Sequence, residues 1–153
     1  MRAFGMIALV SALLSGGPAF ATGGFSCRID DPVLSLDVES GFSHGMGDGL
    51  LNFGGTIEMR DRFAPETLRK VTLDPTHLPH HWLYADSLKL RIYAETDKGA
   101  FASLDLVIET SAKGGDEGTY AGDYRLTLYR VEPPAGAADP QVVKTGKVAC
   151  LVG

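Results

Sequence analysis

Apolar and polar residues alternate along most of the chain after residue 21, and helical periodicity is nearly absent. Such alternation with a period of two is typical of β-strands that bury one face. The alternating segments are 25–29, 34–38, 51–59, 71–73, 88–94, 102–108, 124–128 and 148–152. Gly54 and Gly55 interrupt the third segment and predict a bulge or a bend there. Seven to eight strands with one polar face each predict an all-β fold, either an antiparallel barrel or a sandwich.

The clearest hairpin joins the fifth and sixth of these segments. We expect a three-residue loop centred on Lys98, with Gly99 in the left-handed backbone conformation. This register places Arg91 opposite Asp105 on the polar face. A cross-strand ion pair of this kind specifies the register more than it stabilises the fold.

The other connections differ in character. The long ones are 43–49, 74–86, 111–119 and 132–140. One helical turn is expected near 65–68 and another near 83–85. Because loops carried by a rigid sheet are common binding surfaces, we expect any site to lie in these connections.

Residues 1–21 have the pattern of a secretory signal peptide. Arg2 precedes an uncharged apolar run at 3–14, and Ala19-Phe20-Ala21 forms an A-x-A cleavage site. The apolar run is shorter than the roughly 20 residues that a membrane-spanning helix needs. We therefore expect export to the periplasm or secretion, and a single mature domain at 22–153 that is not embedded in a membrane.

The chain contains two cysteines, Cys27 and Cys150, near the two ends of the expected mature domain. In an oxidising compartment such a pair predicts a disulfide, and two free thiols are the alternative. Both cysteines fall on the apolar phase of their strands, which favours pairing in the core. The bond would close the fold and place the first and last strands side by side.

Composition limits the classes of function. With 153 residues and 44% hydrophobic side chains, the chain has the size and content of one globular domain. Its 14 basic and 19 acidic residues argue against nucleic-acid binding through a broad basic face.

One motif matches a catalytic pattern in its letters. Gly41-Phe42-Ser43-His44-Gly45 reads G-x-S-x-G, the serine-hydrolase motif. That chemistry places the serine on a sharp turn between a strand and a helix. Here glycines and another strand follow, so we expect no helix, and a hydrolase using Ser43 remains only an alternative.

Three histidines lie within five residues of one connection. His77, His80 and His81 would suit zinc or copper, because imidazole binds both metals well. Asp74, Asp86 or His44 could complete the site. The alternatives are that the apolar residues of this segment cap the core while the imidazoles lie in solvent, or that the histidines sense pH. No other cofactor is expected.

Aromatic residues suggest a further surface. Trp82 is the only tryptophan, and the alternation places Tyr93 and Tyr129 on the polar face and Tyr124 inside. Trp82 and the tyrosines, Tyr120 included, would suit a ligand groove or a carbohydrate platform, although exposed tyrosines on strands are common.

The overall layout resembles uncharacterised small secreted proteins of proteobacteria, which are β-rich and have cysteines near both ends. The residues that carry this resemblance are Cys27, Trp82-Leu83, the run 88–93, Tyr120-Ala121-Gly122-Asp123-Tyr124 and Gly146-Lys147-Val148-Ala149-Cys150. The resemblance spans most of the mature chain and implies no known activity.

A disulfide between the ends of a small antiparallel barrel is also similar to the periplasmic inhibitors of c-type lysozyme. Those inhibitors insert a short Ser/Gly/Lys/Tyr loop into the enzyme's cleft. The run Ser111-Ala112-Lys113-Gly114-Gly115, followed by Thr119-Tyr120, has similar residue types in a different order and spacing.

Together these patterns predict a periplasmic or secreted binding module without enzymatic activity. Its partner would be an envelope protein or a small ligand, contacted by loop residues such as Trp82, Lys113 and Tyr120. The alternatives are a metal-binding protein that uses His77, His80 and His81, and a protein like the lysozyme inhibitors.

Overall fold

The computed structural model describes residues 22–43, 49–114 and 118–153. In these ranges nine strands form one antiparallel sheet, which confirms the all-β prediction and adds one strand to the expected count. The strands are β1 (Thr22–Asp30), β2 (Leu34–Ser43), β3 (Leu50–Met59), β4 (Lys70–Leu73), β5 (His80–Tyr84), β6 (Ser87–Glu95), β7 (Ala102–Ala112), β8 (Thr119–Arg130) and β9 (Gln141–Val152). Two short 3-10 turns, η1 (Glu66–Leu68) and η2 (Pro75–His77), flank β4.

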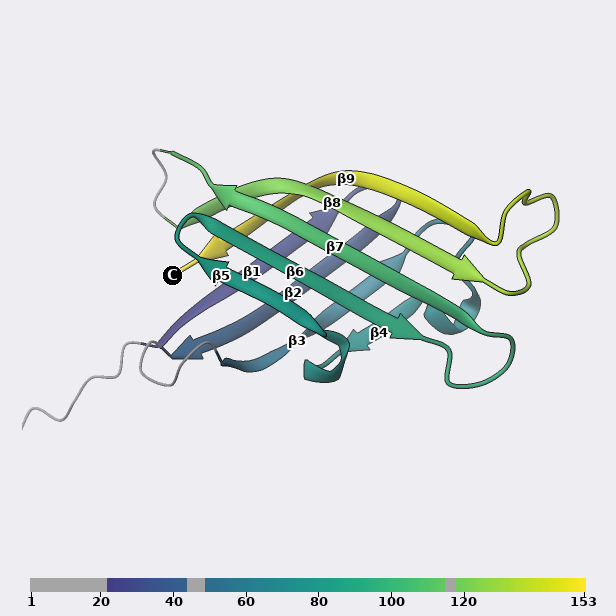
Figure 1. Ribbon diagram of the computed structural model, residues 1–153, viewed down its shortest axis with the longest axis horizontal. Helices are drawn as coiled ribbons and strands as arrows, with labels where there is room; N and C mark the ends of the chain where they lie inside the picture. The colour runs from purple at the N-terminus through teal and green to yellow at the C-terminus, as the bar shows by residue number, and fades with distance from the viewer. Residues whose placement is uncertain (1–21, 44–48, 115–117) are drawn as a thin grey trace, which may run out of the picture.

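The sheet consists of two meanders joined at one seam. Its strand order is β4-β3-β2-β1-β9-β8-β7-β6-β5. Within β1–β4 and within β5–β9, each strand therefore pairs with the strands that precede and follow it in sequence. The first and last strands, β1 and β9, pair at the seam. Figure 1 shows the sheet folded over there, with β1–β4 behind β6–β9 and the two sets of strands crossing.

The ring of strands is open between β4 and β5, so of the two expected forms, a barrel or a sandwich, the sheet does not form a closed barrel. Because every paired neighbour is antiparallel and the number of strands is odd, β4 and β5 run in the same direction. A parallel ladder needs a crossover of about a dozen residues or more. Only residues 74–79 connect these two strands, which is too few for such a crossover.

The core lies between the two layers, on the inner side of the sheet. The strands alternate as predicted; in β6, for example, the inward residues Leu88, Leu90 and Ile92 are at most 2% exposed. The largest fully buried side chains are Tyr124, Leu34, Leu36, Ile57, Met59, Leu88, Leu90, Ile92, Leu104, Leu106, Ile108 and Leu126.

The predicted disulfide is present at the seam. Cys27 and Cys150 are direct partners in the β1–β9 register and are bonded to each other. Their side chains are 1% and 2% exposed, as the apolar phase of both cysteines indicated.

The β6–β7 hairpin differs from its predicted register. Arg91 lies opposite Val107, and Asp105 lies opposite Tyr93, so the loop is centred on Gly99 instead of Lys98. Six residues, 96–101, separate the strands, because the Thr96 hydroxyl bonds to the backbone across the loop. The predicted ion pair still forms, diagonally, with 2.6 Å between Arg91 Nη2 and Asp105 Oδ2. Gly99 has the expected positive φ of 82°.

Three local predictions have mixed outcomes. η1 confirms the helical turn near 65–68, whereas 83–85 contains the end of β5 and a turn at Ala85. The predicted irregularity in β3 begins at Asn52, just before Gly54 and Gly55, and Asn52 has a φ of 57°. The β2–β3 register shifts at this point, between Glu39 and Gly41 of β2.

A partly buried hydrogen bond ties the two halves together away from the disulfide. The Tyr124 hydroxyl on β8 donates to Asp31 Oδ2 at 2.6 Å, and Asp31 Oδ1 accepts the amides of Val33 and Leu34. Partial burial raises the pKa of Asp31, but these hydrogen bonds and the charge of Arg60 outweigh it and hold the pKa below its usual value. Burial and the Asp31 carboxylate raise the pKa of Tyr124.

We expect Tyr124→Phe to lower the free energy of unfolding at pH 7 by about 2 kcal/mol, because it removes a hydrogen bond to a charged group. A carboxyl whose folded pKa is lowered stabilises the fold above its unfolded pKa, and this contribution is lost as pH falls through the folded pKa. The difference between the two proteins should therefore shrink below about pH 4. Urea denaturation at several pH values measures it.

Tyr129→Phe is the matched control, since Tyr129 is half-buried and its hydroxyl makes no side-chain hydrogen bond within the described residues. It should change stability by no more than about 0.5 kcal/mol. Equal losses in both variants would contradict a specific role for the bond between Tyr124 and Asp31.

Candidate functional site

The segment 74–86, expected to be one long connection, contains η2 and the edge strand β5. Asp74 caps η2: its carboxylate accepts the Thr76 amide at 2.8 Å and contacts His77 Nδ1 at 2.9 Å. Hydrogen bonds from Thr76 and His77 lower the pKa of Asp74. His77 is thus held by the cap through Nδ1, one of its two ring nitrogens.

The histidines of this segment are not gathered into a cluster. His80 and His81 are consecutive residues of β5, so their side chains point to opposite faces of the sheet. Where the structure describes the chain, no group of three His, Cys, Asp or Glu side chains could hold a metal ion. His44, one of the residues proposed to complete the site, lies outside the described residues.

β5 presents two large aromatic side chains on the outer face of the sheet. Trp82 lies opposite Lys89, and Tyr84 lies opposite Ser87. Trp82 is 56% exposed and Tyr84 is 72% exposed. Their ring centroids are 6.0 Å apart in an edge-to-face arrangement. The sequence indicated Trp82 as a binding residue and missed Tyr84, although Tyr84 follows Trp82 by the two-residue step that places both on one face.

The other predicted binding residues have different surroundings. Lys113 is exposed at the end of β7, and its amide donates to Thr119 at 2.8 Å. Tyr120 is only 8% exposed, and its hydroxyl donates to the Ala85 carbonyl at 3.2 Å. The expectation that Tyr120 belongs to a binding loop was therefore wrong, because it lies on the inward phase of β8 and packs in the core.

Ser43, the serine of the G-x-S-x-G pattern, is the last residue of β2 and lies opposite Thr22 in the backbone register. The residues that follow it, 44–48, lie outside the described part of the chain. The hydrolase alternative therefore has no described geometry to support it.

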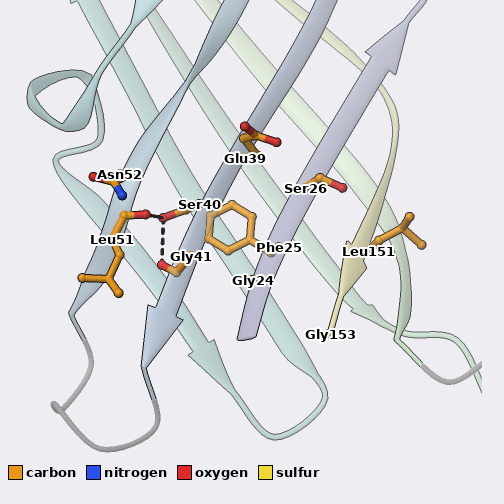
Figure 2. Close-up of a pocket in the computed structure, with 10 residues that line it drawn as sticks. All are labelled: Gly24, Phe25, Ser26, Glu39, Ser40, Gly41, Leu51, Asn52, Leu151 and Gly153. Atoms are coloured by element: carbon orange, nitrogen blue, oxygen red, sulfur yellow. Dashed lines mark hydrogen bonds between the residues drawn. The ribbon is translucent and has the colours of Figure 1, made fainter. Parts of the chain in front are cut away.

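A hollow of about 480 Å³ lies on the outer face near the start of β1 and the ends of β2 and β9 (Figure 2). Leu51, Gly41 and Gly24 form one row across β3, β2 and β1, and Gly153, the residue after β9, continues this row. The three glycines leave the floor of this row without side chains. Leu51 and Leu151, which are 40% and 61% exposed, form apolar walls.

Inside the sheet, the Ser40 hydroxyl bonds to the carbonyls of Leu51 and Gly41 at 3.1 Å (Figure 2). This satisfies the Leu51 carbonyl next to the β2–β3 register shift. The rim of the hollow at Leu51 is therefore fixed by a buried hydrogen bond.

One carboxylate, that of Glu39, lines the hollow. The other carboxylates on the strands have partners: Asp30–Arg60, Asp37–Arg28, Glu58–Lys70, Asp105–Arg91, Glu109–Lys89 and Asp123–Lys147 are ion pairs, and Glu95 accepts the Tyr93 hydroxyl. Among strand carboxylates in the described ranges, Glu39 alone has no ion pair or side-chain hydrogen bond. Glu39 is not among the residues that the sequence pattern indicated.

By its fold the chain is an antiparallel all-β protein with one buried disulfide and two exposed candidate surfaces. Comparisons with protein-family models, curated proteins and solved structures find no match to it. Among the described residues, no helix has the length and apolar character needed to cross a membrane.

Proposed function

We propose that the chain is exported and serves as a non-enzymatic binding module in the periplasm or outside the cell. The signal-peptide pattern of residues 1–21 and the buried disulfide support export, because disulfides persist in oxidising compartments.

The exposure of Trp82 and Tyr84 is the observation that carries the binding role. Tryptophan and tyrosine are enriched among the residues that dominate binding energy, since they combine a large apolar body with a polar tip. β5 is hydrogen-bonded to β6 and leaves both rings in solvent. Because the strand is already ordered, little conformational entropy is lost when a partner covers the rings. Lys89, opposite Trp82, supplies a polar rim. The partner is an envelope protein or a small ligand of the same compartment.

Replacing both aromatics, Trp82→Ala with Tyr84→Ala, should abolish this recognition. Loss of one such contact residue typically costs about 2 kcal/mol, or about 30-fold in affinity. The measurement compares what the immobilised wild-type and variant proteins retain from the extracytoplasmic fraction of the cell that makes them, with peptidoglycan fragments and lysozyme as defined probes. Because Trp82 is the only tryptophan, its fluorescence reports directly on occupancy of this surface.

Phe101→Ala provides a matched control. Phe101 is 43% exposed and forms a similar pair with Tyr129, with 6.1 Å between ring centroids. It should retain the wild-type partner. If the variant that lacks Trp82 and Tyr84 retains that partner equally well, these side chains are not the recognition surface.

A further inference from the structure

We propose that the hollow around Glu39 is a second binding site, which takes an ammonium group carried on an apolar stem. The site is separate from the Trp82–Tyr84 surface, because it is built from β1, β2, β3 and the end of β9. The inference therefore goes beyond the proposed function and does not depend on it.

The shape of the hollow suits the stem of such a ligand. Gly24 and Gly41 are opposite each other in the β1–β2 register, and Gly24 exchanges backbone hydrogen bonds with Gly153. Three strands thus approach one another without a side chain on the outer face at this row. The volume of about 480 Å³ lies in the range of small-molecule pockets, and Leu51 and Leu151 offer apolar contact at its sides.

The charge of the hollow selects the head group. Of the side chains that line it, only that of Glu39 is charged, while Ser26 and Asn52 are polar and neutral. A neutral apolar ligand would take water from the Glu39 carboxylate without replacing its hydrogen bonds, and an anion would be repelled. A cation offers the charge-assisted hydrogen bond that Glu39 lacks among the described residues.

The comparison with the rest of the outer face supports the same conclusion. Cross-strand pairs such as Arg28–Asp37, at 2.7 Å, and Lys147–Asp123, at 2.6 Å, neutralise the neighbouring carboxylates. Opposite Glu39 the register places Ser26 on one side and Gly54 on the other, and neither can supply a positive charge. The position where a basic side chain would neutralise Glu39 therefore lies in the hollow, where a ligand could take its place.

The test is an NMR titration of the folded, disulfide-bonded protein with n-pentylammonium, following backbone amide shifts. We expect saturable shifts at Gly24, Gly41 and Leu151. Pentan-1-ol, which has the stem without the charge, and methylammonium, which has the charge without the stem, should each bind at least about fivefold more weakly. Nα-acetyl-lysine N-methylamide distinguishes the source: tighter binding than pentylammonium identifies a lysine side chain of a partner, and weaker binding identifies a free amine.

Two variants and one control make the test specific. Glu39→Gln should weaken pentylammonium binding about fivefold, and Gly41→Ala should weaken it by adding a methyl group to the floor. An added Cβ at Gly41 meets no atom nearer than 3.6 Å, so the fold should be retained. Glu58→Gln makes the same charge change on the neighbouring strand β3, outside the hollow, and should leave binding unchanged. The proposal is overturned if no saturable shifts occur, if the alcohol binds as well as the amine, or if Glu39→Gln binds like the wild type.

Discussion

Replacing Cys27 and Cys150 together by alanine is expected to lower the free energy of unfolding by about 4 kcal/mol at 25 °C. The two residues are 123 positions apart in sequence. For a loop of that length the chain-entropy model gives about 5 kcal/mol, and measured losses for native disulfides are about 2–5 kcal/mol. Both side chains are buried, so the substitution also removes sulfur atoms from packed surroundings. Urea denaturation of the oxidised wild type and the double variant measures the difference.

The loss should appear first at the seam between β1 and β9. This ladder contains four residue pairs, whereas β1–β2 has nine and β8–β9 has eleven. Hydrogen exchange should therefore accelerate in β1 and the end of β9 more than in β7. Wild-type protein reduced with dithiothreitol separates the bond from the packing of the sulfurs and should lose most of the same stability. If the oxidised and reduced proteins unfold at the same urea concentration, the cross-link contributes nothing to stability.

Alternation predicted every strand that buries one full face. In β7, for example, Leu104, Leu106 and Ile108 are completely buried and the residues between them are not, so the period of two is visible in the sequence. The disulfide was predictable for the same reason, because both cysteines share the apolar phase of their strands. Whether the sheet closes into a barrel was not predictable, since closure depends on the directions of the two edge strands, β4 and β5.

β5 escaped prediction because it buries almost nothing. Within His80–Tyr84 only Leu83 is half-buried, and the other residues are exposed. The strand forms through its ladder with β6, across a turn at Ala85 and Asp86 where we expected a helical turn. The metal-binding alternative for the histidines assumed a loop, which could bring neighbouring imidazoles together, whereas a strand separates them.

The two candidate surfaces differ in how far a single sequence can indicate them. Trp82 is conspicuous by its type alone. The hollow at Glu39 depends on which residues of neighbouring strands share one row, and that information lies in the register. The glycines at 24 and 41 occupy outward positions, where alternation gives no reason to notice a missing side chain.

Gly122→Ala should destabilise the protein by about 3 kcal/mol, the second large effect that we expect. A Cβ at Gly122 would lie 2.0 Å from the Glu109 carbonyl oxygen and 2.8 Å from the Thr110 Cα. Both atoms belong to the backbone of β7, so no side-chain rotation relieves the overlap and the β7–β8 ladder must separate. Thr110 is buried and its hydroxyl donates to the Leu88 carbonyl at 2.9 Å, so β7 is also held from its other side. Thermal or urea unfolding measures the loss.

Gly41→Ala is the matched control, because it adds the same methyl group to a strand glycine where the new Cβ makes only ordinary van der Waals contacts, the nearest at 3.6 Å. It should be neutral or slightly stabilising, since alanine reduces the entropy of the unfolded chain. The N-terminal half repeats the close approach: a Cβ at Gly55 would lie 2.1 Å from the Asp37 carbonyl oxygen, between β3 and β2. Both halves of the folded sheet thus contain a glycine where two strands come unusually near, and we expect Gly55 and Gly122 to be needed for its curvature. Equal stability of the Gly122 and Gly41 variants would show that the strands can separate at no cost, and would refute that requirement.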